Sequence, residues 1–390
     1  MTTALKKEVI PDFHLPSEIY LKQDIINEAG GILKNFGSRA VLITTDQDLA
    51  KFSDAIEKIS RSIAKSSLGF IIYDEMSATP DTEYIDSAVY FAKKTHCDMI
   101  IGFGGIESMN AAKAVALLMN NYLFCENLFE HPEVSPPVNL VTIPAYPSVG
   151  FEILPMLYVD EIQYRMKNVY AHKYLFPKAS IIDPQIATII DDESTAYSSV
   201  GSLALATESV ISKINNGMIN TYALKSIDLI FKNLPVAFRE PQNTAARAQL
   251  ALASVMSGVA FSVANLSITL ALSLALSSRT SIPVTHAMGV ILPHIMEYNL
   301  TSSPGKYVQM SKVMDEDVKE ITVIEAAIKA VEGVRKLEID IDIPQRLSLF
   351  DIGKSEFSRV AEIALTYPFI ENAPRPLTRD EMETILIAAY

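Results

Sequence analysis

Short apolar runs alternate with amphipathic stretches through the first half of the chain. Five runs rich in β-branched residues predict strands, at residues 40–45, 69–74, 98–103, 139–144 and 179–183. Between several of them apolar residues recur with a helical period, as in IINEAGGILKNF, DLAKFSDAIEKISRSIA and EYIDSAVYFAKK. This alternation predicts a parallel sheet covered by helices on both faces, and the wholly apolar MIIGF run is typical of a central strand.

The pattern changes after Asp183 and Pro184, and from Asp191 onward it is mostly helical. We therefore predict two domains, an α/β domain of the nucleotide-binding type over residues 1–184 and a helical domain over residues 185–390. The cleft between two such domains is the natural place for a ligand.

One apolar stretch, without charge between Arg247 and Arg279, is long enough to span a bilayer. However, it is rich in Ser and Ala, Gly258 and Asn265 interrupt it, and no aromatic belt or basic flank marks a membrane orientation. We predict buried core helices there and no membrane partner.

Composition narrows the class of protein. The chain has 390 residues, 49% of them apolar and 20% charged, which is typical of a globular protein. Its net charge of −13, with no basic run, argues against nucleic acid and anionic lipid as partners. Cys97 and Cys125 form no CxxC motif, and the first residues have no apolar signal core, so we expect a cytoplasmic protein without disulfides or a zinc knuckle.

The stretch IIGFGGIESMNAAKAVA is the first candidate for chemistry. It reads as a strand, a turn with Gly104 and Gly105, and a helix that carries Lys113. Glycines at such a turn let backbone N–H groups approach a pyrophosphate, and the helix N-terminus favours an anion. Tight strand-to-helix turns also need glycine for purely structural reasons, so this motif alone leaves both interpretations open.

Longer stretches carry a specific resemblance. TIPAYPSVGFE stands where one family reads roughly TIPTTAGTGSE, SIPVTHAMGVILPHIMEYN matches its PHGLANALLLPHVMRFN-like stretch, and YRMKNVYAHKYLFPKASIIDPQ matches its hairpin-like segment. From about Phe13 to the C-terminus the chain resembles the iron-containing alcohol dehydrogenases, whose relatives include lactaldehyde reductases. The resemblance implies the dehydroquinate synthase-like fold, with a Rossmann-like N-terminal domain and an all-α C-terminal domain.

The resemblance implies that the helical domain of this family holds a divalent metal through one Asp and three His. The metal polarises the alcohol oxygen, and hydride passes to NAD(P) in the sheet domain. The four ligand positions here are Gly201, Leu205, Leu270 and Val284, and no His or Asp lies within residues 198–207 or 263–284. These side chains carry no oxygen or nitrogen donor that could bind a metal. We therefore interpret the four positions as an eroded metal pocket, and we expect no metal ligand and no bound metal.

The nucleotide side is also altered. Five residues match or replace the family's cofactor contacts: Asp46, Gly104, Gly105, Asn110 and Lys113. Ile106 replaces the third glycine of the turn, Glu107 brings a negative charge, and AYPSV at residues 145–149 replaces the family's TTAGT. From these changes we expect weak or absent NAD(P) binding.

The remaining polar residues are weighed as metal ligands or as surface charges. His286 follows a lost ligand position by two residues and, with Glu208, is the candidate for a rebuilt metal site. Asp160 and Glu161 are expected to be solvated loop charges.

Three functions remain open. The first is a repurposed, catalytically silent family member that binds a small molecule in the interdomain cleft or assembles with a protein partner. The second is a metal-independent NAD(P)-dependent oxidoreductase of a small aldehyde, ketone or alcohol, in which a Tyr or His acid replaces the metal. The third binds a different small ligand without redox chemistry. The resemblance also implies a homodimer formed through the sheet domain.

Overall fold

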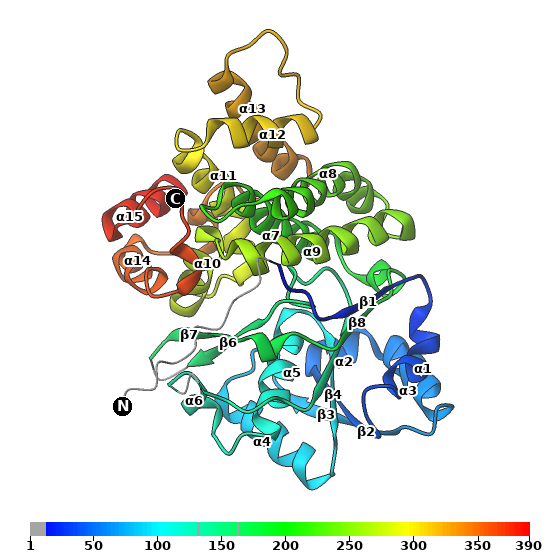
Figure 1. Cartoon of the computed structure of the whole chain (residues 1–390). Helices are drawn as coiled ribbons and strands as arrows, with labels where there is room; N and C mark the ends of the chain where they lie inside the picture. Colours follow the sequence, from blue (N-terminus) through cyan, green and yellow to red (C-terminus); the bar gives the residue numbers. More distant parts are fainter. Residues whose placement is uncertain (1–12, 131–132, 162–163) are drawn as a thin grey trace, which may run out of the picture.

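The computed structural model describes residues 13–390 apart from 131–132 and 162–163. Figure 1 shows a half built around a sheet and a half built of helices, stacked one on the other. The prediction of a parallel α/β domain followed by a helical domain is confirmed.

The main sheet has six strands in the order β1-β8-β5-β4-β2-β3, and every pairing in it is parallel. Its strands are β1 (Glu18–Leu21), β2 (Arg39–Thr45), β3 (Gly69–Met76), β4 (Met99–Gly104), β5 (Asn139–Pro144) and β8 (Ala179–Ile182). All five predicted strands are present, and their ends shift by at most two residues. The short edge strand β1 is half-exposed and was not predicted, because it has no apolar run.

Helices cover both faces of the sheet, as the alternation along the strands requires. Val41 and Ile43 of β2 pack in one core with α4 and α5, whereas Ala40 and Leu42 pack in the other with α1 and α3. The period of two along a strand sends neighbouring side chains to opposite faces. The helices of this half are η1 (Ile25–Glu28), α1 (Ala29–Leu33), α2 (Asp46–Lys51), α3 (Ser53–Ala64), α4 (Thr82–Lys94), α5 (Ile106–Met119) and α6 (Cys125–Leu128).

A two-stranded antiparallel hairpin lies between the sheet and the helical half. It consists of β6 (Met156–Glu161) and β7 (Met166–Ala171), and it precedes η2 (Lys173–Leu175), β8 and η3 (Ile186–Ile189). The buried hydroxyl of Tyr367 donates to the carbonyl oxygen of Lys167 at 2.8 Å, which ties the hairpin to the helical half.

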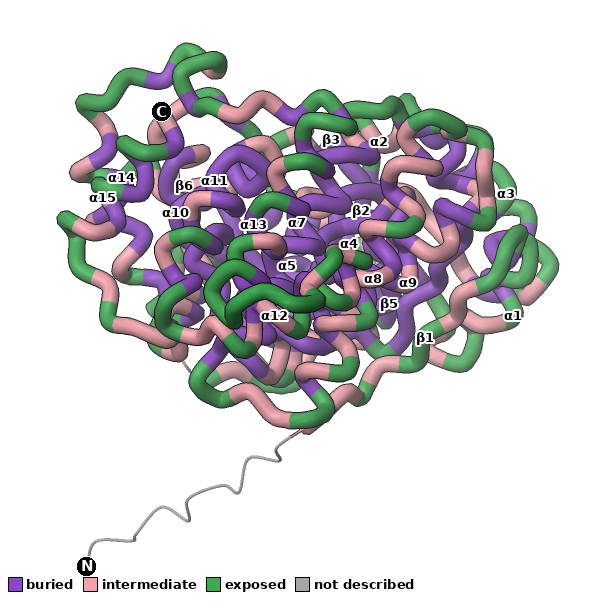
Figure 2. The backbone as a smooth tube through the Cα atoms, turned by 90° about the horizontal axis from the view of Figure 1, so that it is seen from above, coloured by how far each residue is buried: buried purple, intermediate pink, exposed green. Residues whose placement is uncertain are grey.

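The helical half forms one large apolar core. Its elements are α7 (Asp192–Ile211), α8 (Gly217–Arg239), α9 (Thr244–Ala264), α10 (Ile268–Arg279), α11 (Val284–Leu300), α12 (Pro304–Val313), α13 (Val323–Asp340), η4 (Leu347–Phe350), η5 (Lys354–Glu356), α14 (Phe357–Ala364), η6 (Pro368–Ile370) and α15 (Arg379–Ala388). By length and composition α9 is apolar enough to cross a membrane, but 67% of its most apolar window is buried in the fold. Figure 2 shows the buried backbone concentrated in the centre of the molecule, and the prediction that this segment forms buried core helices is confirmed.

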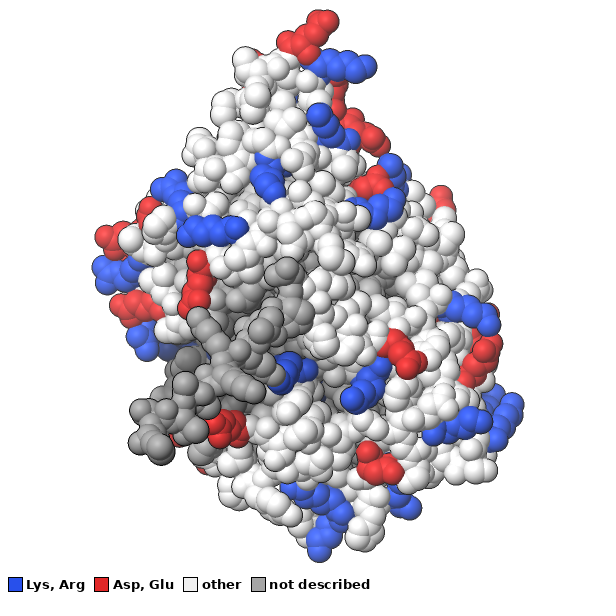
Figure 3. Space-filling view, viewed as in Figure 1, with Lys and Arg blue, Asp and Glu red and all other residues white. Residues whose placement is uncertain are grey.

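The two halves meet closely at two glycines. A Cβ added at Gly258 of α9 would lie 2.8 Å from the Cα of Gly150, and the Gly150 N–H donates to the Ser254 hydroxyl at 3.0 Å. On the outer face drawn in Figure 3, acidic and basic side chains are interspersed rather than gathered into one basic patch.

Candidate functional site

A cleft of about 720 Å³ lies between the carboxyl edge of the sheet and the helical half. Its wall combines the turns after β2 and β4, the β6–β7 hairpin, the start of α7 and the segment that joins α10 to α11. Ligands of parallel α/β proteins bind at this edge of the sheet, and the volume suits a small molecule or cofactor. The lining residues that matter below are Asp48, Gly105, Glu107, Tyr146, Tyr158, Asp160, Lys167, Tyr197, Val284 and His286.

The glycine turn at the end of β4 opens into this cleft. Gly104 has a φ of +129°, a backbone conformation that favours glycine, and Gly105 is the N-cap of α5. The Gly105 N–H donates to Asp48 Oδ2 at 2.9 Å, and the Ser108 hydroxyl donates to the same oxygen at 2.7 Å. The N-terminal anion position of α5 is therefore taken by a carboxylate of the chain itself.

Both glycines also make room for neighbouring side chains. A Cβ at Gly104 would collide with the Asp48 carboxylate, and a Cβ at Gly105 would collide with the Tyr146 hydroxyl. Tyr146, from the AYPSV segment, thus covers the turn from the other side.

The five predicted cofactor contacts occupy different environments. Gly105 lines the cleft, Gly104 precedes it in the turn, and Asp46 is exposed at the start of α2. Asn110 accepts from the Tyr158 N–H at 3.3 Å. Lys113 is fully buried, where its Nζ donates to the Met156 carbonyl oxygen at 2.8 Å, and burial lowers its pKa to about 7.

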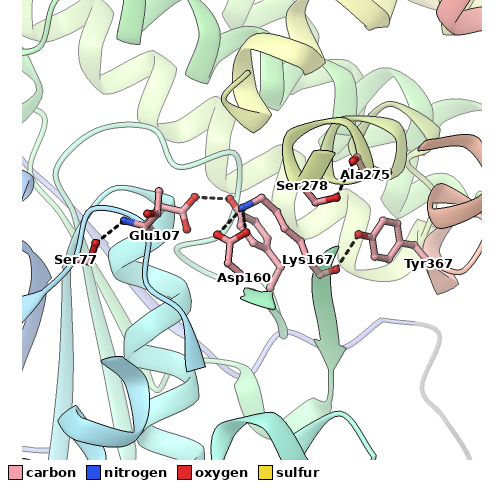
Figure 4. A network of polar contacts seen from close by, with 9 residues as sticks. Ser77, Glu107, Asp160, Lys167, Ala275, Ser278 and Tyr367 are labelled. Carbon is pink, nitrogen blue, oxygen red and sulfur yellow. Dashed lines mark hydrogen bonds and ion pairs between the residues drawn. The ribbon is translucent and has the colours of Figure 1, made fainter. Parts of the chain in front are cut away.

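Four side chains from α5 and the hairpin form a polar network on the cleft wall (Figure 4). The Tyr158 hydroxyl donates to Glu107 Oε1 at 3.0 Å. Lys167 Nζ lies 2.6 Å from each carboxylate oxygen of Asp160 and 5.5 Å from the centre of the Tyr158 ring. The expectation of a solvated loop charge at Asp160 is wrong, because Asp160 lies within β6 and pairs with a buried lysine.

Within this network Glu107 titrates near neutral pH. Its side chain is partly open to the cleft, yet the protein around it raises its pKa from 4.5 to about 7, mainly by desolvation, while the Lys167 charge opposes the rise. The same burial and the neighbouring Glu107 hold the pKa of Tyr158 well above 10. A carboxyl with a pKa near the working pH is suited to giving and taking a proton.

His286 lies on the opposite, helical wall of the cleft. Its Nε2 is 3.2 Å from Glu193 Oε1, and its ring stacks on Tyr197 with 3.6 Å between centroids. Desolvation lowers the pKa of His286, so the ring is neutral at pH 7.

The four positions matching the family's metal ligands are buried in the helical half, and of the four Val284 alone lines the cleft. Gly201 and Leu205 lie one turn apart on α7, Leu270 lies on α10, and Val284 begins α11. The three larger side chains belong to a single apolar cluster. A Cβ at Gly201 would lie only 2.8 Å from Cγ2 of Val149, which fills the space beside the glycine.

Glu208, the other residue considered for a rebuilt metal site, has a structural role. It is buried and accepts hydrogen bonds from the Ser267 hydroxyl at 2.8 Å, the Ile268 N–H at 2.5 Å and the Thr269 N–H at 3.1 Å. It therefore satisfies donors in the first turn of α10, and it does not line the cleft as His286 does. In the described part of the chain, no three His, Cys, Asp or Glu side chains are grouped to hold a metal ion.

Comparisons with known proteins cover nearly the whole chain. The family described as "Iron-containing alcohol dehydrogenase" matches residues 16–184, and "Fe-containing alcohol dehydrogenase family, C-terminal" matches residues 195–390. The 1,3-propanediol dehydrogenase of Citrobacter freundii is 26% identical over 97% of this chain and 98% of its own length. The NAD-dependent methanol dehydrogenase of Bacillus methanolicus is 22% identical over 96% and 98%. A crystal structure of a 1,3-propanediol oxidoreductase superposes with a TM-score of 0.92 at 25% identity, covering 98% of this chain and all of that one.

These matches contradict the expectation of no metal and of weak or absent NAD(P) binding. The matching family is iron-containing and one relative is named as NAD-dependent, which points to a metal and NAD as cofactors. For NAD, the open cleft and the glycine turn fit a dinucleotide, although the Asp48 carboxylate from α2 accepts a hydrogen bond from the turn. For the metal, the four corresponding side chains offer no oxygen or nitrogen donor, so those residues do not fit it and no ligand is assigned.

Sequence reasoning missed the polar network of Glu107, Tyr158, Asp160 and Lys167, and the Asp48 contact. Glu107 stood out only as an unfavourable charge, and Asp48 not at all. The available signal was the two short strand-like runs MLYVDE and MKNVYA, which pair as a hairpin that carries Tyr158, Asp160 and Lys167. Nothing in the sequence indicates that this hairpin faces Glu107.

Proposed function

The chain belongs to the iron-containing alcohol dehydrogenase family, and on that premise we propose that it interconverts a small alcohol and its aldehyde or ketone in the interdomain cleft, with a nicotinamide dinucleotide as cofactor. The cleft, at about 720 Å³, is large enough for a cofactor group and a small substrate. The relatives named for 1,3-propanediol and methanol support a short alcohol as substrate.

The observation that carries the proposal is Glu107, a carboxyl at the cleft wall with a pKa near 7. A bound nicotinamide supplies or accepts the hydride at carbon, which leaves one proton to be handled at the substrate oxygen. Glu107 holds that proton in the reduction and takes it in the oxidation, while the Tyr158 hydroxyl, which donates to Oε1, fixes the orientation of the carboxyl.

Lys167 and Asp160 act as positioning residues in this proposal. The Lys167 charge limits the rise in the pKa of Glu107, and the Asp160 carboxylate, 2.6 Å from Lys167 Nζ, partly opposes this effect. The pair thereby keeps the pKa of Glu107 near neutrality instead of higher.

The test is Glu107→Gln, assayed with short alcohols and aldehydes from pH 5 to pH 9. Glu107 is an acid below about pH 7 and a base above it, so the wild-type reduction rate should fall, and the oxidation rate rise, as pH increases through 7. Glu107→Gln should lower kcat by about 10²-fold or more and remove that pH dependence. The matched control is Glu83→Gln, a charge change on the exposed first turn of α4. An unchanged kcat and pH profile in Glu107→Gln would refute this role.

A second candidate is supported by the packing at Gly201, Leu205, Leu270 and Val284. Their apolar surroundings favour a family member that binds a small molecule in the cleft, or a protein partner, without turnover. Assays with NADH, added Fe²⁺ and a panel of short aldehydes separate the candidates. Turnover excludes the second candidate, whereas nucleotide or aldehyde binding without turnover supports it.

We also propose a homodimeric, cytoplasmic protein. The dimer is supported by family membership and by the edge strand β1, where Ile19 is 37% exposed. Cys97 and Cys125, both free and buried, suit a reducing compartment.

A further inference from the structure

The amide group at the start of α5 already has an anionic partner. Asp48 Oδ2 accepts from the Gly105 N–H at 2.9 Å and from the Ser108 hydroxyl at 2.7 Å. The Ser108 hydroxyl in turn accepts from the Thr45 N–H at 3.1 Å, so α2, the end of β2 and α5 share one hydrogen-bonded cluster. The carboxylate is half-buried and lies on the cleft wall.

A backbone N–H at a helix N-terminus and a serine hydroxyl are also the donors that hold a phosphate oxygen. A carboxylate oxygen and a phosphate oxygen compete for the same donors, because both are charged acceptors. The Asp48 carboxylate therefore occupies the hydrogen-bond donors that a phosphate group of a bound dinucleotide would use at this turn.

Tyr146 restricts the turn from the opposite side. Its hydroxyl lies against Gly105 so closely that no Cβ would fit between them, and its side chain is shielded by Phe52, with 6.2 Å between the ring centres. The free approach to the turn is therefore the side on which Asp48 lies.

We propose that Asp48 is a built-in competitor for the pyrophosphate of the nicotinamide dinucleotide, which must displace the Asp48 carboxylate from the Gly105 N–H in order to bind. The inference rests on the proposed function, because it concerns the cofactor named there. It makes Asp48 the residue that sets the affinity of the cleft for phosphate-bearing ligands.

The displacement requires only the side chain to move. The Asp48 N–H is held independently by the Thr45 hydroxyl at 3.2 Å, as part of the N-cap of α2. Rotation of the side chain about its own bonds releases Gly105 and Ser108 while the backbone of α2 stays in place. Lys51, on the same helix, attracts the Asp48 carboxylate electrostatically, and its Nζ pairs with Asp191 Oδ2 at 2.9 Å.

The test measures binding, not turnover, by calorimetric titration of the full chain with ADP-ribose, NADH and adenosine. ADP-ribose carries the pyrophosphate without redox chemistry, and adenosine lacks the phosphates. Asp48→Ala should bind ADP-ribose and NADH at least tenfold more tightly than the wild type and leave adenosine unchanged. Asp48→Asn, which keeps the shape and an acceptor oxygen but loses the charge, should fall between them. The matched control is Asp54→Ala, an equal loss of charge at an exposed residue on the first turn of α3.

Thermal melting of each variant verifies that it is folded, and Asp48→Asn serves if Asp48→Ala is not. Equal affinity for ADP-ribose in the wild type and both Asp48 variants overturns the inference and leaves the proposed function standing. A similar gain in Asp54→Ala also overturns it, since general charge would then be the cause. Absence of binding of ADP-ribose and NADH to every variant overturns the proposed cofactor itself, and the inference with it.

Discussion

At the scale of single residues, Gly201 and Val149 form a matched pair. Val149 is fully buried at a φ of +54°, a conformation that a β-branched residue rarely adopts, and its Cγ2 occupies the space where a Cβ of residue 201 would lie. The packing explains why residue 201 is glycine within a long buried helix, where glycine is otherwise unfavourable.

We expect Gly201→Ala to lower the free energy of unfolding by about 1–2 kcal/mol, because the added methyl collides with a stiff side chain. In a Val149→Ala background the same substitution should be neutral or stabilising, since alanine favours a helix. Gly31→Ala in α1 is the control, because a Cβ there would meet nothing within 4 Å. Urea denaturation of the four variants measures the coupling, and additive effects would refute the collision.

At the scale of elements, α10 depends on a residue from another helix. Glu208 of α7 accepts hydrogen bonds from two N–H groups and the N-cap hydroxyl at the start of α10, and burial raises its pKa from 4.5 to about 7. The carboxyl therefore binds a proton more tightly in the folded state than in the unfolded chain.

The sign of the pH effect follows from that shift. The contribution of Glu208 to stability is fully present below pH 4.5 and is lost as pH rises through about 7. Between pH 5 and pH 8 the stability of the wild type should fall relative to Glu208→Gln by up to about 3 kcal/mol. Chemical denaturation at several pH values measures it, with Glu57→Gln on the exposed face of α3 as control. Parallel curves for wild type and Glu208→Gln would contradict the assignment.

At the scale of the whole molecule, the site exists only because the two halves meet. Two contacts hold the hairpin and the helical core at the cleft. One is the close approach of Gly150 to Gly258, and the other is the hydrogen bond from the Tyr367 hydroxyl to the carbonyl oxygen of Lys167. A shift between the halves would therefore separate Glu107 on one wall from His286 on the other.

The proposed homodimer makes a prediction at this scale. Light scattering after gel filtration should give a mass of twice 42.9 kDa. Because the unpaired edge of β1 is the proposed contact, Ile19→Lys should shift the mass toward 42.9 kDa, whereas Ile387→Lys, at an exposed position on α15, should not. A monomeric wild type would contradict the proposal.

The sequence by itself determined the parallel sheet, five of its six strands, the buried helices and the family, because periodicity and motif order are local properties of the chain. It also identified the residues at the four positions that match the family's metal ligands. Short or half-exposed elements such as β1 carried too weak a pattern to be predicted.

Only the tertiary structure decided what those residues do. Asp48 reaches Gly105 across 57 positions of sequence, and Tyr158 reaches Glu107 across 51. Such contacts depend on how strands and helices pack, and pairs this far apart leave no local pattern in a single sequence. The pKa of Glu107 is likewise set by desolvation among these neighbours, and desolvation is a property of the folded molecule alone.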